Sequence, residues 1–555
     1  MAFLPFPSLF SGLLLTMMKL PARWCALPVG GLVAMFFLVF IFSSGRSQVH
    51  AQPATAAAAL VSQTKANKSS VEHQAADHGH HDDATGAAED HSADHHAHEH
   101  GAMRKTMPLW TVIPFAALLL CIAIFPLANP HWWEHNTNKG YIVVALSLPV
   151  ALYLAVAYGE VGRHELTHKV LEFISFIILL GSLYIISGGI YIRGSLNGTP
   201  LANTALLAIG AVIASFIGTT GASVLLIRPL LRANKKRRDV AHVVIFFIFI
   251  VSNCGGLLTP LGDPPLFMGF MKGVPFEWTF RLWPQWLLVN LALLVIFNIW
   301  DQIALAREEQ ARAGSQLEEV MKHEPLGVDG GLNFVFLLGI VATIYCSGNF
   351  PVAGKLPWPF GIGEAIMVAL AVAGYFTTKQ SYRENNRFTF GPIIEVAVLF
   401  IGIFITMTPA LLILNAWGDN GEFGREVAGN KLTISEPWQF FWMTGVLSSF
   451  LDNAPTYIAM AATACGIHNV PVADGPYLKE FLAKGEVPMQ LLAAISCSAV
   501  FMGANTYIGN GPNFMVKAIA EENQVRMPSF FGYMLYSGGV LIPIFIVVTL
   551  VFFRG

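Results

Sequence analysis

A succession of long apolar segments limits the folds open to this 555-residue chain. From Leu109 onward, segments long enough to cross the hydrocarbon core of a bilayer alternate with short polar loops. Only 12% of the residues are charged, against about a quarter in an ordinary soluble protein. We therefore expect an all-α polytopic membrane protein in contact with the lipid bilayer. The predicted spans are 109–127, 140–158, 170–192, 240–271, 284–300, 331–347, 360–376, 391–415, 488–518 and 528–553.

Charge and cysteine content exclude several other classes of protein. The 33 Lys and Arg nearly cancel the 35 Asp and Glu, so the chain lacks the basic excess with which nucleic-acid-binding proteins release counterions. The six cysteines are scattered and form no CxxC pair. We expect no nucleic-acid partner, no disulfide scaffold, no zinc ribbon and no iron–sulfur site.

The first 108 residues differ from the rest of the chain. In residues 1–51, Lys19 and Arg23 precede an apolar run from Leu27 to Phe42, which predicts either a signal peptide or a first transmembrane helix. Residues 52–108 contain a His-rich tract and few large apolar side chains, so we predict disorder. Imidazole and carboxylate groups suit weak binding of Zn²⁺, Ni²⁺ or Cu²⁺, and the alternative is a solvated tether. The candidate ligands are His78, His80, His81, His95, His96, His98 and His100.

Basic residues predict the orientation of the chain in the membrane. They cluster at 228–238 and again at 379–387, and the positive-inside rule places both loops in the cytoplasm. Counting the helices between these loops makes residues 304–330 a cytoplasmic linker. The same count places the His-rich segment in the periplasm of a bacterial-type inner (plasma) membrane, on the far side from the basic loops.

Two further apolar stretches are interrupted midway by polar residues. The stretch 201–232 is broken at residues 218–221, and the stretch 436–465 is broken at residues 452–455. Each break exposes backbone groups that hydrocarbon cannot satisfy, so both tips must lie in protein or in a water-filled cavity. The pattern predicts two re-entrant hairpins.

An internal repeat relates two broken helices. Residues 255–268 align with residues 502–515 at an offset of 247, and six of the fourteen positions are identical. The hairpin tips correspond as well, because 214–217 resembles 448–451. We predict two inverted repeats, 109–303 and 331–555, each with a hairpin and a broken transmembrane helix, as in secondary transporters with a midplane site. The identical pairs are Gly256/Gly503, Thr259/Thr506, Gly262/Gly509, Pro265/Pro512, Phe267/Phe514 and Met268/Met515.

Residues 252–265, 449–456 and 503–510 resemble the signatures of the ion transporter superfamily. The resemblance is closest to its branch of sodium/proton antiporters, arsenite pumps and citrate transporters, and it covers residues 109–553. It implies a scaffold domain that forms a homodimer and a mobile transport domain that moves in an elevator fashion. Dicarboxylate members carry a Ser-Asn-Thr triplet at each hairpin tip, where this chain has residues 218–220 (Gly-Thr-Thr) and 452–454 (Asp-Asn-Ala).

Carboxylates inside a membrane are costly and are functional by default. Asp263 and Asp452 lie at the breaks, and Glu172 and Glu395 in neighbouring spans are possible proton-coupling residues. Hard oxygen ligands suit Na⁺, and a proton can compete for the same acid, which is an exchange mechanism. We therefore predict a sodium/proton antiporter that needs no cofactor. The predicted ion- or substrate-binding residues are Thr219, Thr220, Ser223, Ser252, Asn253, Thr259, Gly262, Asp263, Asp452, Asn453, Thr456, Asn505, Thr506, Gly509 and Asn510.

Three alternatives remain open. Half-helix N-termini at Gly221 and Pro455 suit an anion, so a citrate or other carboxylate transporter coupled to a cation or proton is the second interpretation. The alternative to a proton-coupling role for Glu172 is that its side chain snorkels to the polar region near a membrane face. The remote alternative is an intramembrane zinc metalloprotease, because residues 164–168 fit the HExxH pattern of His164, Glu165 and His168. We expect that pattern in a polar lead-in outside the hydrocarbon, which disfavours the protease.

Overall fold

The computed structural model describes Met103 and residues 106–554, apart from Leu196, 312–323, 353–357, 420–425, 428–429, 432–433 and 473–474. These residues belong to the unit that comprises residues 96–555. The predicted signal peptide or first helix and the candidate histidine ligands between His78 and His100 lie outside the described residues.

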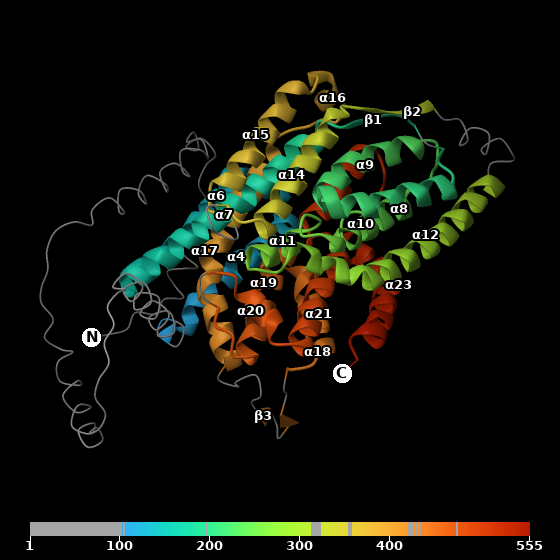
Figure 1. The fold of residues 1–555 in the computed structure, drawn as a ribbon. Helices are drawn as coiled ribbons and strands as arrows, with labels where there is room; N and C mark the ends of the chain where they lie inside the picture. Colours follow the sequence, from blue (N-terminus) through green and yellow to red (C-terminus); the bar gives the residue numbers. More distant parts are fainter. Residues whose placement is uncertain are drawn as a thin grey trace, which may run out of the picture. The chain divides into compact units, whose positions relative to one another are not determined.

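Apolar helices make up nearly all of the described fold (Figure 1). Within the described residues, ten helices are long and apolar enough to cross a membrane. The prediction of an all-α polytopic membrane protein is therefore confirmed. The helices before the first hairpin are η2 (Leu109–Val112), α4 (Ile113–Ala128), α5 (Pro130–Trp133), α6 (Asn136–Ala157) and α7 (Gly159–Ser187).

The first hairpin and the first broken helix follow a short strand, β1 (Tyr191–Ser195), which pairs antiparallel with β2 (Glu324–Asp329). The helix pair α8 and α9 turns at Gly218, and the predicted span 240–271 is interrupted between Ile250 and Pro264. The elements are α8 (Pro200–Ile217), α9 (Thr219–Ala233), α10 (Ala241–Ile250), η3 (Cys254–Leu258), α11 (Pro264–Met271), η4 (Phe276–Leu282) and α12 (Trp283–Ala311).

The second half repeats this order of a helix, a helix pair and a broken helix. It begins with α14 (Leu332–Asn349), α15 (Ile362–Thr377), α16 (Gln380–Asn385) and α17 (Gly391–Asp419), and then a short ladder of β3 (Glu426–Val427) and β4 (Asn430–Lys431). The remaining elements are α18 (Pro437–Phe450), α19 (Asn453–Ile467), α20 (Tyr477–Ala483), α21 (Glu486–Met502), η6 (Gly503–Asn505), α22 (Gly511–Glu522) and α23 (Phe530–Phe552).

Three elements differ from the predicted boundaries. Helix α7 begins at Gly159, well before the predicted start at residue 170, and it ends at Ser187. Helix α12 continues to Ala311, into the predicted linker 304–330, and β2 lies at the end of that linker. Hydropathy underestimates both helices because it counts charged residues such as Lys169 in α7 and Asp301 in α12 as solvated, whereas these two are buried in ion pairs.

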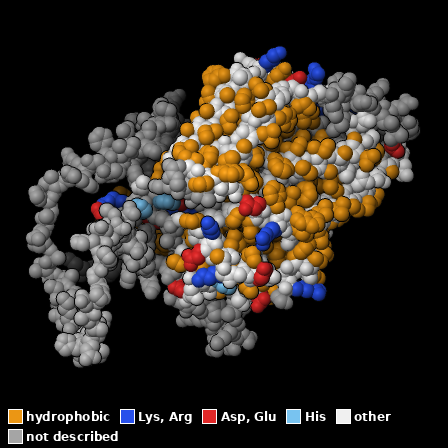
Figure 2. All heavy atoms as spheres, in the orientation of Figure 1, with side chains coloured by type: hydrophobic (Ala, Val, Ile, Leu, Met, Phe, Trp, Pro, Cys, Tyr) orange, Lys and Arg blue, Asp and Glu red, His pale blue; other side chains and the backbone are white. Residues whose placement is uncertain are grey.

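The broken helices lie inside the bundle, and the apolar surface lies outside it. Every residue of α10 after Ala241 is buried, and so is most of α21. Exposed large apolar side chains gather instead on helices such as α4, α12, α14 and α23. Figure 2 shows hydrophobic side chains over most of one face. This arrangement places the irregular backbone of the breaks where protein atoms surround it, as a membrane protein requires.

Candidate functional site

The first break forms because glycine lets two backbone segments touch. A Cβ atom on Gly262 would lie 2.0 Å from the carbonyl oxygen of Gly256. Between them, Thr259 is extended, and its hydroxyl donates to the carbonyl oxygen of Ser215 in α8 and accepts from the Leu261 N–H at 3.1 Å. The irregular segment between α10 and α11 is therefore fastened to the first hairpin.

The second break makes the corresponding contacts. A Cβ atom on Gly509 would lie 2.6 Å from the carbonyl oxygen of Gly503. The Thr506 hydroxyl donates to the carbonyl oxygen of Ser449 in α18 at 2.5 Å and accepts from the Ile508 N–H at 3.2 Å. Residues matched in the sequence alignment, such as Thr259 and Thr506, thus fasten each break to its own hairpin.

Gly218 forms the turn of the first hairpin and brings it to the first break. Its φ of +82° is a conformation that glycine adopts readily and that other residues rarely adopt. The next residue, Thr219, donates its backbone N–H to the carbonyl oxygen of Gly262 at 2.8 Å. The tip of the hairpin is therefore docked on irregular backbone rather than on a helix.

Asparagine side chains join the two breaks. Asn253 donates to the Asn513 side-chain oxygen at 2.7 Å, and Asn510 donates to the Asn253 side-chain oxygen and to the Ser252 carbonyl, both at 3.1 Å. Asn513 in turn donates to the Gly503 carbonyl at 2.8 Å. The two breaks therefore form one polar centre, although about 250 residues separate them in the sequence.

The carboxylate of Asp263 is the focus of this centre. Its side chain is 1% exposed and accepts from the Thr219 hydroxyl at 2.7 Å. The side-chain amides of Asn453 and Asn510 donate to it at 2.5 Å and 3.3 Å. Each of these donors is neutral, and among the described residues no Lys, Arg or His forms an ion pair with Asp263.

In the described part of the chain, four helices begin at this carboxylate. Thr219 and Asn453 are the first residues of α9 and α19, while Asp263 and Asn510 are the N-caps of α11 and α22. A helix N-terminus carries about half a positive charge, and its field fades within the first turn. The partial positive charges of the four ends therefore favour negative charge at this point.

A second carboxylate and an unpartnered oxygen adjoin Asp263. Asp452 is the N-cap of α19, is half-buried and interacts electrostatically with Asp263. Asn453 is completely buried, and its side-chain oxygen Oδ1 has no hydrogen-bond partner among the described residues. Two acids and a free amide oxygen are hard ligands of the kind that alkali and alkaline-earth cations prefer.

The other predicted residues lie at or near this centre in supporting roles. The hydroxyls of Ser223 and Ser252 share a hydrogen bond of 2.8 Å between α9 and the first break. The Asn505 amide donates to the Ser449 hydroxyl at 2.9 Å, and the Thr456 hydroxyl donates to the Asp452 carbonyl at 3.0 Å. These contacts hold the breaks and the hairpins in place around Asp263.

A cavity of about 60 Å³ borders the first hairpin tip. The tip residues Gly218, Thr219 and Thr220 form one wall together with Gly262. The opposite wall consists of apolar residues of α7 and α17, among them Leu183 and Val396. The polar centre thus meets an apolar surface from the helices that precede each hairpin.

The sequence of the chain matches a family of transporters. Residues 104–553 match the sequence profile of a family described as "Putative citrate transport". The chain belongs to this family. A relative from Synechocystis sp. (strain PCC 6803), named as an uncharacterized transporter, is 23% identical over 337 residues, which are 57% of this chain and 69% of the relative.

This member of the citrate-transport family is a multi-pass membrane transporter and not an enzyme. The resemblance to the ion transporter superfamily and its citrate-transporter branch is confirmed at the level of the family. The profile spans both breaks and both hairpins, so it includes every residue of the polar centre.

Glu172 does not snorkel toward a membrane face in this transporter. It is buried in α7 and pairs with Lys272 at the end of α11. The Lys169 ammonium lies 3.4 Å from its other oxygen, and His168 Nδ1 lies 3.0 Å away. The snorkelling alternative is therefore wrong, because two lysines supply the charge compensation that solvent would otherwise give.

Glu395, the second acid predicted to couple protons, lies apart from the polar centre. It pairs with the buried Lys139 of α6 at 2.7 Å, and its own side chain is 42% exposed. Neither Glu172 nor Glu395 contacts Asp263 in the structure, and each has a lysine partner from a different helix. The proton-coupling role of these two acids stays a prediction.

The HExxH pattern lies within the long helix α7, whereas we expected it in a polar lead-in before the span. Glu165 lies within α7 and is 5% exposed, with its carboxylate 3.3 Å from the Lys169 ammonium. His164 is exposed, whereas His168 contacts Glu172. A carboxylate neutralised by lysine is poorly suited to act as the general base of a zinc protease. The family match to transporters removes the protease interpretation.

Sequence reasoning missed Asn513, which is completely buried and bonds to both breaks. In the repeat alignment Asn513 is matched with Leu266, so identity between the two halves could not reveal it. The feature that could have revealed Asn513 is its residue type, because it is the third asparagine in a segment of glycines and a proline within a predicted span. Lys272 was missed for a different reason, because only the fold brings it to Glu172.

Proposed function

We propose that this transporter exchanges Na⁺ for protons at the centre formed by Asp263, Asp452 and Asn453. The observation that carries the proposal is the buried Asn453 Oδ1, which lacks a hydrogen-bond partner among the described residues and adjoins a carboxylate without a cationic partner. A buried, unsatisfied carbonyl oxygen costs about 1–3 kcal/mol, and a bound cation removes that cost. Na⁺ is the transported or coupling ion in this proposal.

The same carboxylates explain how Na⁺ is exchanged for protons. A Na⁺ ion and a proton both neutralise Asp263, and they cannot occupy it together. Binding of one therefore expels the other, which couples their movement without a further residue. The four helix N-termini support this proposal because they favour the ionised form that Na⁺ requires.

We further infer that the chain contains two inverted repeats, residues 109–303 and 331–555, whose hairpins and broken helices form a mobile transport domain. This domain moves past a dimeric scaffold domain in an elevator fashion. The paired contacts of Thr259 with Ser215 and of Thr506 with Ser449 support the repeat. The apolar wall that α7 and α17 present to the first hairpin tip supports a sliding surface. In this proposal the protein resides in the plasma membrane, with the His-rich segment in the periplasm.

A carboxylate transporter, with citrate as the first substrate to test, is the second candidate. The description of the family favours it. The converging N-termini of α9 and α19 also favour it, because backbone N–H groups at helix N-termini bind anions. In that case a cation on Asp263 and Asp452 offsets the charge of the substrate, so the two acids keep a role.

Transport assays on reconstituted vesicles test both candidates. Proteoliposomes that contain a pH-sensitive dye are exposed in turn to Na⁺, Li⁺, citrate and succinate. Antiport predicts that Na⁺ alone moves protons, and that Asp263→Asn and Asp452→Asn abolish this signal while expression is retained. Asp329→Asn is the matched control, because Asp329 lies in β2 and faces the exposed Arg193 at 4.0 Å.

The outcomes separate the candidates. Saturable uptake of labelled citrate that requires Na⁺, without proton movement by Na⁺ alone, would replace antiport with the second candidate. Wild-type proton movement in the Asp263→Asn and Asp452→Asn variants would remove the polar centre from the mechanism in either form.

A further inference from the structure

A cavity of about 220 Å³ lies beside the C-terminal part of α12. Helix α12 forms one side of it with Trp300, Ile303 and Arg307. The other side is the connection between α9 and α10, through Arg238 and Asp239. None of these residues belongs to the transport site described above, so the cavity calls for a separate explanation.

An apolar stripe on α12 leads to this cavity. Leu287, Leu291, Val295, Ile299 and Ile303 recur at every fourth position, and each is at least 43% exposed. Each step of four residues turns by about 40° around a helix with 3.6 residues per turn, so these side chains form a ridge about 24 Å long that winds part of the way around α12. The next position in the series is Arg307, which is exposed. The stripe is therefore apolar along its length and cationic at its end.

The two arginines of the cavity are available to a ligand. Arg238 and Arg307 are exposed, and among the described residues neither guanidinium forms an ion pair. Glu308 also lines the cavity, but its carboxylate faces the buried guanidinium of Arg237 at 3.8 Å and accepts from the backbone N–H groups of Arg238 at 3.3 Å and Asp239 at 3.2 Å. Asp239 adds one exposed negative charge, against the two exposed arginines.

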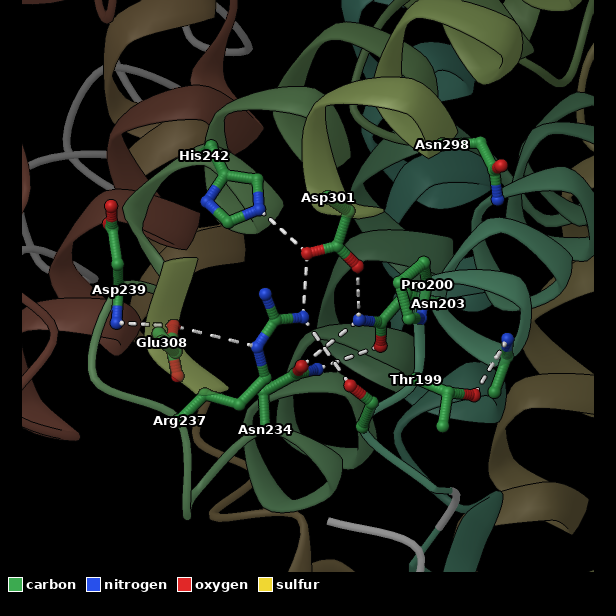
Figure 3. A network of polar contacts seen from close by, with 12 residues as sticks. Thr199, Pro200, Asn203, Asn234, Arg237, Asp239, His242, Asn298, Asp301 and Glu308 are labelled. Carbon is green, nitrogen blue, oxygen red and sulfur yellow. Dashed lines mark hydrogen bonds and ion pairs between the residues drawn. The ribbon is translucent and has the colours of Figure 1, made fainter. Parts of the chain in front are cut away.

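A buried polar network joins the connection between α9 and α10 to α12 (Figure 3). Arg237 pairs with Asp301 of α12 at 2.6 Å, and both side chains are fully buried. His242 and Asn203 also contact the Asp301 carboxylate, at 2.8 Å and 3.0 Å. The network fixes the segment that carries Arg238 against α12, so the two arginines of the cavity keep their spacing.

We propose that this cavity binds the headgroup of an anionic phospholipid, with Arg238 and Arg307 on the phosphate and the acyl chains along the α12 stripe. The surface matches the parts of a lipid in their order along the helix. The apolar stripe suits the acyl chains, Trp300 lies at the boundary between the stripe and the arginines, and the two guanidinium groups suit the phosphate. Arginine binds phosphate through paired N–H groups, and basic pockets between helices favour anionic lipids.

Native mass spectrometry of the full-length protein in detergent micelles tests the proposal. The protein is titrated with phosphatidylglycerol or with phosphatidylcholine of the same acyl chains. We expect preferential binding of phosphatidylglycerol that falls about 30-fold in Arg238→Gln/Arg307→Gln, which corresponds to about 2 kcal/mol at 1.4 kcal/mol per tenfold. Arg238→Lys/Arg307→Lys retains the preference, because the charges remain.

The control variant removes the same number of positive charges at positions outside the cavity. Arg281→Gln/Arg554→Gln removes two exposed arginines, of which Arg281 lies just before the other end of α12, and lipid binding should be unchanged. Equal loss in the control variant, or equal binding of both lipids by the wild type, overturns the proposal. Displacement of phosphatidylglycerol by millimolar glycerol 3-phosphate or inorganic phosphate would also overturn it, in favour of a site for a soluble phosphate.

Discussion

The pair between Arg237 and Asp301 offers a direct test of the buried network. Substitution of Arg237 by Met keeps an unbranched apolar stem but removes the guanidinium. The Asp301 carboxylate then remains fully buried without its cationic partner at 2.6 Å. His242 at 2.8 Å and Asn203 at 3.0 Å still contact it, so part of its compensation survives.

The expected loss follows from these contacts. Removal of one partner from a buried ion pair costs about 3–5 kcal/mol, and the surviving contacts place Arg237→Met at the lower end, about 3 kcal/mol. Asp301→Asn keeps an acceptor for the Asn203 amide and removes the charge. The double variant should therefore lose less than the sum of the single losses, by about 2 kcal/mol.

Reversible unfolding in mixed micelles of a nonionic detergent and sodium dodecyl sulfate, followed by circular dichroism, measures these free energies. Arg238→Met is the matched control, because the neighbouring arginine is exposed and forms no ion pair among the described residues; its loss should stay within about 0.5 kcal/mol. Equal destabilisation by Arg237→Met and Arg238→Met, or additive losses in the double variant, would refute the reasoning.

Two further predictions concern the breaks and the N-terminal segment. Gly262→Ala places a Cβ atom 2.0 Å from the Gly256 carbonyl oxygen. It should lower the free energy of unfolding, measured by thermal unfolding, by about 1–3 kcal/mol and should impair flux. Gly511→Ala should match the wild type, because no described atom lies within 4 Å of the added Cβ. Deletion of residues 52–104 should leave the transport rate within about twofold, since the polar centre contains none of these residues. The Ni²⁺ or Zn²⁺ content measured by elemental analysis should fall, because the deleted segment holds the histidines. Loss of transport in metal-free buffer would contradict this prediction.

The breaks were predictable because their cause is local. Glycine and proline interrupt helices wherever they stand, and the same interruption occurred twice at matched positions. The sequence therefore indicated the interruptions near Gly262 and Gly509, and in the structure residues 259–263 and 506–510 are non-helical. Thr259 and Thr506 could also be found, because identity between the two halves marked them.

The charged interior was not predictable from local pattern. Glu165 and Lys169 gave the start of α7 the hydropathy of a loop, yet each neutralises the other within a buried helix. Arg237 stood in a run of basic residues typical of a solvated loop, but its partner Asp301 lies 64 positions further along the chain. Hydropathy treats each charge as if water surrounded it, and only the fold reveals which charges are paired.

The asparagine bridge between the breaks has a consequence for biosynthesis. Asn253 is bonded to Asn510 and Asn513, which follow it by 257 and 260 residues. At about 5–20 residues per second, a ribosome needs roughly 13–52 s to make the intervening chain. Throughout that interval the first broken helix is already synthesised while its polar partners do not yet exist. The nascent first half must therefore keep its unsatisfied amides in contact with water or with the insertion machinery until the last helices arrive.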